Sequence, residues 1–78
     1  MIPLDALLGR KETAAALTEA GYPVTAETLT TKASRGGGPP YRRFGPRALY
    51  RWGDSLEWAR SRLSAPRRSA AEHAAAQG

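Results

Sequence analysis

The first helical pattern of hydrophobic and polar positions lies between Gly9 and Gly21. Thr13, Ala14 and Leu17 fall on one face at helical spacing, and strong helix formers occupy most positions around them. Gly9 marks the start, and Gly21 can adopt the left-handed conformation that commonly ends a helix. The apolar stripe is narrow and rich in alanine, so we expect a neighbouring element to pack close against it.

A second, shorter helix is indicated by the capping residues that follow the first one. Thr25 is suited to an N-cap, and Glu27 places negative charge in the first turn, where the helix dipole favours it. We therefore expect a helix from about Ala26 to Ser34. Val24 and Leu29 supply the apolar contacts that pack this helix onto the first.

Glycines and prolines at positions 36–40 end helical structure, and residues 41–51 then show a short apolar alternation on either side of a Gly-Pro pair. This pattern predicts a β-hairpin of two strands of about four residues each. We expect Phe44, Ala48 and Tyr50 to face the helices, because docking onto a helical core stabilises a short hairpin. The arginines expected to stay exposed are Arg43, Arg47 and Arg51.

A third helix is predicted over residues 53–63, with Asp54 near its start and Arg60 and Arg62 near its end, as the helix dipole prefers. Its expected core contacts are Trp52, Leu56, Trp58 and Leu63. The chain is thus predicted to be mostly α with a small β-hairpin, built from three helices and two strands. We expect one domain over residues 1–64 and an alanine-rich basic tail over residues 65–78 that is flexible or forms a short helix.

Composition disfavours several classes of function. The chain has 78 residues and no cysteine, so disulfides and thiolate metal sites are excluded, and the core must come from aliphatic and aromatic packing. His73 has no second histidine nearby and carboxylates do not cluster, so we predict no metal, no cofactor and no enzymatic activity. Apolar runs stay far below the roughly 20 residues that span a bilayer, and no signal-peptide pattern is seen, which predicts a cytoplasmic protein without membrane contact.

Positive charge is concentrated between Arg35 and Arg51. This segment holds five arginines and no acidic residue, and its charge equals the formal net charge of +5 of the whole chain. Concentrated positive charge is typical of proteins that bind nucleic acid. A protein-interaction module, in which the arginine hairpin binds an acidic protein surface, is the alternative of another class.

Four short motifs follow the predicted helix pair in order. They are the run Arg35-Gly36-Gly37-Gly38-Pro39-Pro40-Tyr41, the pair Phe44-Gly45, the pair Tyr50-Arg51, and Asp54 with Trp58 four residues on. Over residues 7–63 this order resembles the excisionase-type winged helix-turn-helix proteins, small DNA-binding proteins related to the MerR-like winged-helix group. The chain departs from that family at Lys32, where members have a bulky apolar residue, and at Ala26 and Glu27, where they have arginines. Its link between the helices is also longer.

The resemblance implies that the second helix lies in the major groove of duplex DNA and that the hairpin is a wing on phosphates or in the neighbouring minor groove. The candidate residues on this recognition helix are Thr25, Ala26, Glu27, Thr30, Thr31, Ser34 and Arg35. The candidate residues on the wing are Arg42, Arg43, Gly45, Arg47 and Arg51.

The same resemblance implies a role as an excisionase, or recombination directionality factor. Such a protein binds double-stranded DNA side by side with further copies at an attachment site, bends the DNA and assists an integrase. A small transcriptional regulator of the same fold is an alternative that the sequence leaves open. The expected partners are double-stranded DNA, other copies of this chain on that DNA, and an integrase.

Overall fold

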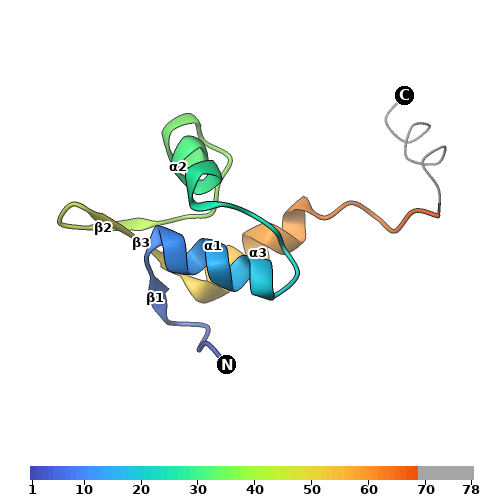
Figure 1. Cartoon of the computed structure of the whole chain (residues 1–78), viewed down its shortest axis with the longest axis horizontal. Coiled ribbons are helices and arrows are strands. Elements are labelled where there is room, and N and C mark those ends of the chain that lie inside the picture. Colours follow the sequence, from blue (N-terminus) through green and yellow to red (C-terminus); the bar gives the residue numbers. More distant parts are fainter. Residues whose placement is uncertain (69–78) are drawn as a thin grey trace.

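The computed structural model describes residues 1–68, which form a small mixed α/β domain (Figure 1). Its elements in chain order are β1 (Leu7–Leu8), α1 (Arg10–Glu19), α2 (Ala26–Arg35), β2 (Arg42–Phe44), β3 (Arg47–Arg51) and α3 (Trp52–Arg62). The strands pair antiparallel in the order β1-β3-β2. Residues 63–68 contain no helix or strand, and the part of the predicted tail from residue 69 onward, with His73, lies outside the described residues.

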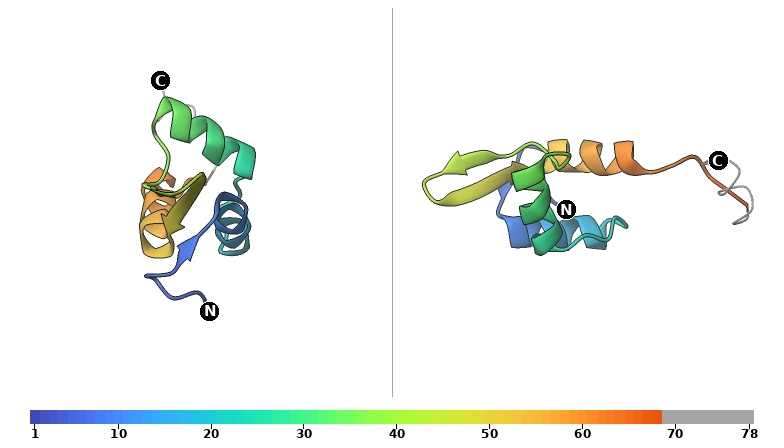
Figure 2. Two further views of the ribbon diagram at one scale, coloured as in Figure 1. Left: turned by 90° about the vertical axis from the view of Figure 1, so that its left-hand side faces the viewer. Right: turned by 90° about the horizontal axis from the view of Figure 1, so that it is seen from above.

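The helices and the hairpin occupy different parts of the molecule. α1 packs against both α2 and α3, and Figure 2 shows α2 lying across the other two helices. The hairpin of β2 and β3 projects beyond the helices, as both Figure 1 and the right-hand view of Figure 2 show. Within residues 1–68, no helix is long and apolar enough to cross a membrane.

The sheet has three strands, whereas the sequence pattern predicts two. β1 pairs with β3, with Leu7 opposite Arg51 and Leu8 opposite Tyr50. A two-residue strand is too short to show a period, which is why the pattern misses it. The pairing continues into α3, where the backbone N–H groups of Trp52 and Gly53 donate to the carbonyls of Ala6 and Leu4 at 2.9 and 2.8 Å. The N-terminal segment thus satisfies two of the free N–H groups at the start of that helix.

α1 and α2 confirm the predictions made from capping and burial. Thr13, Ala14 and Leu17 are the buried residues of α1. The helix ends in a Schellman motif, because Gly21 has a φ of +103° and its N–H donates to the carbonyl of Thr18, while the next N–H donates to Leu17. Leu29 is the buried residue of α2, the helix that packs against α1.

The core is centred on Leu17, Trp52 and Ala59, with Leu56 and Trp58 packed partly buried around it. The prediction that Leu63 is a core contact is wrong, because its side chain is 64% exposed. α3 ends at Arg62. Leu63 has an extended backbone, so it does not continue the helix face that packs on the core. The buried residues of α3 are Trp52, Ser55 and Ala59, and two of them, Ser55 and Ala59, have small side chains that allow close contact.

Candidate nucleic-acid interface

The register of the hairpin determines which side chains share a face, and this distribution differs from the predicted one. Arg42 lies opposite Leu49, Arg43 opposite Ala48, and Phe44 opposite Arg47. Cross-strand partners project from the same face of a sheet. Therefore Phe44 shares the outer face with Arg47 and Arg42, while Arg43 shares the face of Ala48. The prediction that Phe44 packs on the helices is wrong, since its side chain is 73% exposed.

The turn of the hairpin explains the error. Gly45 and Pro46 are the two loop residues, and Gly45 has a φ of +61°, as the first central position of a type II′ turn requires. Across a two-residue loop, an even-numbered residue of one strand pairs with an odd-numbered residue of the other. An alternation counted straight through the loop, which grouped Phe44 with Ala48 and Tyr50, therefore assigns the first strand to the wrong face.

The exposed arginines of the hairpin differ in how they are held. Arg51 donates to the Oδ1 of Asp54 at 3.0 Å. Among side chains of the described residues, this is the one ion pair. Arg47 reaches the start of α1: a Cβ added at Gly9 would lie 3.1 Å from its Nη2 and 2.6 Å from the Oε1 of Glu12. Neither Arg42 nor Arg43 forms an ion pair within the described part of the chain, and both side chains are exposed. The strongest local positive charge therefore lies toward the tip.

The outward side of α2 carries small polar side chains. Ala26, Thr30 and Ser34 follow one another at intervals of four residues, and Glu27 and Thr31 form the neighbouring row. All are exposed except Ala26, which is half-buried. The Thr30 hydroxyl donates to the carbonyl of Ala26 at 3.0 Å, so it is left as an acceptor. Arg35, the last residue of the helix, is also exposed and is basic where the helix dipole favours it.

Thr25 is placed as the N-cap of α2, as the sequence predicts. Its Oγ1 accepts from the backbone N–H of Thr28 at 3.1 Å. We expect Thr25→Ala to lower the free energy of unfolding by about 1 kcal/mol, because an N–H group at the helix start loses its partner. Urea denaturation followed by circular dichroism measures this change. Thr25→Ser keeps the acceptor oxygen and is the control, and equal stability of the alanine variant and the wild type would contradict the capping role.

An arginine–tyrosine cluster joins α1 to the base of the hairpin. The Nε of Arg10 donates to the hydroxyl of Tyr50 at 2.9 Å, and its guanidinium lies 5.5 Å from the ring centroid of Tyr41. The two tyrosine rings are 5.6 Å apart. Sequence reasoning missed this cluster, because Arg10 and Tyr50 are 40 positions apart and each has an ordinary local assignment. The cluster fixes the hairpin against the helix pair.

The glycine-rich connection between α2 and β2 is tied to α3. The carbonyl of Gly37 accepts from the Nε1 of Trp58 at 2.9 Å and from Nη2 of Arg62 at 2.6 Å. Gly37 has a φ of +89°, where other residues are strained, and a Cβ at Gly38 would lie 2.9 Å from the Cβ of Lys32. These glycines therefore allow close packing of the connection.

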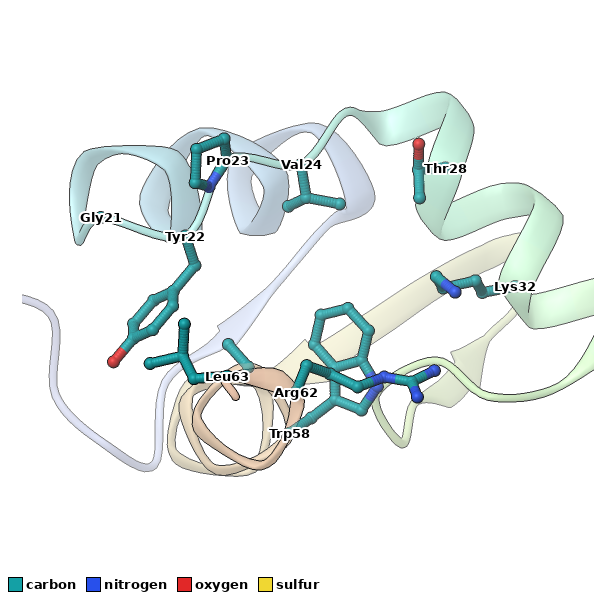
Figure 3. Close-up of a pocket in the computed structure, with 10 residues that line it drawn as sticks. Gly21, Tyr22, Pro23, Val24, Thr28, Lys32, Trp58, Arg62 and Leu63 are labelled. Carbon is teal, nitrogen blue, oxygen red and sulfur yellow. The ribbon is translucent and has the colours of Figure 1, made fainter. Parts of the chain in front are cut away.

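An open groove with a volume of about 340 Å³ lies between the α1–α2 link, α2 and the end of α3. Figure 3 shows the side chains that line it. Its lining residues are Gly21, Tyr22, Pro23, Val24, Thr28, Lys32, Trp58, Ala59, Arg62 and Leu63. Lys32 is half-buried and lines this groove together with Trp58. Thr28 and Lys32 stand on the side of α2 away from Thr30. The groove is therefore separate from the outward side of α2.

Within residues 1–68, no three histidine, cysteine, aspartate or glutamate side chains are grouped to hold a metal ion. Comparison of the chain with protein-family models, with curated proteins and with solved structures found no match. The chemical content of the candidate interface is thus a row of small polar groups on α2 and a projecting hairpin with exposed arginines.

Proposed function

We propose that this chain is a sequence-specific double-stranded DNA-binding protein of the winged helix-turn-helix class. In this proposal α1 and α2 are the helix-turn-helix, α2 is the recognition helix, and the β2–β3 hairpin is the wing. The observation that carries the proposal is the projection of Arg42 and Arg43, exposed and without a carboxylate partner in the described chain, from a hairpin anchored beside the helix pair. Exposed arginines of this kind suit the phosphate backbone.

The two surfaces would contribute differently to binding. Phosphate contacts from the wing supply affinity and position the protein, whereas side chains of α2 read the base edges. Glu27 can accept a hydrogen bond from a cytosine amino group, and the methyl groups of Thr30 and Thr31 can contact thymine. Arg51 contributes less than the other wing arginines, because Asp54 neutralises it.

The side chains of α2 that would contact bases are small, so one copy of the protein would have only modest specificity for a DNA sequence. A single module of this kind buries roughly 600–1,000 Å² on DNA, so occupancy of a site requires several copies side by side or a partner. An excisionase that assists an integrase at an attachment site meets this requirement, and the motif resemblance described above supports it. A transcriptional regulator of the same fold meets it too.

Footprinting on the DNA around the gene and any neighbouring attachment site tests the proposal. Protection at the attachment site is expected for an excisionase, and protection confined to a promoter would replace that role by transcriptional regulation. Glu27→Gln and Thr30→Ala are expected to change which duplexes are preferred while the dependence of affinity on salt stays the same. If the protein binds no duplex DNA at low salt, the DNA-binding proposal is wrong.

The second candidate function is binding to an acidic protein surface. It is favoured by exposed apolar side chains among the arginines of the outer sheet face, where Leu7 lies opposite Arg51 and Phe44 opposite Arg47. A mixed apolar and basic surface of this kind is also found at protein interfaces. Capture of an acidic partner without affinity for duplex DNA at low salt would favour this function over the first.

A further inference from the structure

Phe44 is an exposed aromatic side chain at the tip of the hairpin. It is the last residue of β2, directly before the turn, and it is 73% exposed. Single exposed apolar residues are ordinary on protein surfaces. Phe44 differs from them in its position, because the hairpin that carries it extends beyond the helices (Figure 1). No element of the described chain covers it.

Arginines are the neighbours of Phe44 in the hairpin. Arg47 lies directly opposite Phe44 across the hairpin, and Arg42 shares its face two residues earlier. Arg43, the preceding residue, projects from the other face. Both faces of the hairpin therefore carry an arginine next to Phe44 in the strand, while the guanidinium of Arg47 extends toward Gly9 at the start of α1. An apolar group in this setting can reach the interior of a polyanion while its neighbours contact the phosphates.

The tip is also pre-organised. The Phe44–Arg47 pair closes the ladder, and Pro46 has a fixed φ while Gly45 takes the conformation of a type II′ turn. Little backbone freedom is then left to lose when the tip binds. A rigid apolar tip is what insertion into a stack of bases requires, because the side chain must be held in place while the bases separate.

We propose that Phe44 is a wedge that enters the minor groove and inserts between two base pairs, kinking the duplex while Arg42, Arg43 and Arg47 contact the adjacent phosphates. The inference rests on the proposed DNA-binding function and adds the mode of contact. Apolar wedges of this kind partly unstack one step and bend DNA by about 20–90° toward the major groove. Pyrimidine–purine steps unstack most easily, so we expect the wing to favour a TA or CA step.

Ligation of a fragment of about 110 base pairs into circles tests the wedge, because this length is below the ~150-base-pair persistence length and circles form slowly without a bend. The wild-type protein is expected to raise the yield of circles, and Phe44→Ala to abolish this increase. Phe44→Ala is also expected to bind roughly 5- to 100-fold more weakly, the range for loss of one aromatic stacking contact. Its salt dependence should equal that of the wild type, because no phosphate contact is lost.

Two further variants separate insertion from charge and from general loss of apolar surface. Phe44→Arg adds a cation at the tip and removes the wedge, so it is expected to bind DNA without promoting circles. Leu63→Ala removes a side chain of similar exposure from the other end of the domain and should leave both readouts unchanged.

The outcomes distinguish the wedge from the function on which it rests. If the wild type binds DNA, and Phe44→Ala and Phe44→Arg raise the yield of circles as much as the wild type does, the wedge proposal is wrong while DNA binding stands. If the wild type binds no DNA at low salt, the DNA-binding proposal and the wedge both fall. Loss of circles in both Phe44 variants, with wild-type salt dependence in the alanine variant, supports the wedge.

Discussion

Replacing Arg42, Arg43 and Arg47 together by glutamine is expected to lower affinity for duplex DNA by roughly 100- to 500-fold at 0.1 M salt. Each phosphate contact contributes about 0.9 to the slope of log affinity against log salt concentration, so the slope should fall by about 2.7. All three side chains are exposed, so the fold should be retained. Fluorescence anisotropy on a labelled duplex, repeated over a range of salt concentrations, measures both quantities.

A single exchange elsewhere serves as the matched control. Arg60 is exposed on α3 and lies outside the hairpin, so Arg60→Gln removes the same charge as Arg43→Gln. We expect Arg43→Gln to reduce the salt slope by about 0.9 and Arg60→Gln to leave it unchanged. Equal effects of the two exchanges would mean that net charge, and not the hairpin, determines the affinity.

Leu17→Ala is expected to destabilise the domain more than any surface change. Leu17 is fully buried and contacts Trp52 and Ala59 at the centre of the core. The exchange loses the transfer free energy of the side chain and leaves a cavity, together about 2–5 kcal/mol. In a domain of this size that corresponds to a fall in melting temperature of roughly 8–40 °C, since 1 kcal/mol shifts it by about 4–8 °C. Thermal unfolding followed by far-ultraviolet circular dichroism measures the shift.

The control for this experiment is Leu63→Ala, which makes the same chemical change at a residue that is 64% exposed. We expect its stability to stay within about 0.5 kcal/mol of the wild type. If Leu63→Ala unfolded at the lower temperature of the two, the assignment of the core to Leu17, Trp52 and Ala59 would be wrong.

Local signals allowed the sequence to predict the helices and the hairpin. Thr25 indicates the start of α2, and Gly21 indicates the end of α1. The pair Gly45-Pro46 indicates the turn of the hairpin. Each acts on its own backbone or on N–H and carbonyl groups a few residues away, so its consequence can be read from a short window. The bounds of α1 and α2 were therefore predicted to within a residue or two.

The contacts that locate the candidate site were beyond prediction, because they join distant parts of the chain. β1 pairs with β3 across more than 40 positions, and the hydrogen bond from Trp58 to Gly37 spans 21. The outward position of Phe44 depends on the register across the turn, which a pattern of alternation does not contain. The candidate residues on α2 and the hairpin are exposed, except for half-buried Ala26, and their contact with DNA stays a prediction.

The carbonyl of Gly37 restrains movement of the hairpin relative to α2, which bears on the proposed binding to DNA. This single oxygen holds the connection between α2 and β2 to the far end of α3 through Trp58 and Arg62. A rotation of the hairpin relative to α2 that pulled the connection outward would stretch both hydrogen bonds at once. In the proposed complex, α2 and the hairpin would therefore approach DNA as a single body, and a duplex of unsuitable curvature would have to deform to fit the protein.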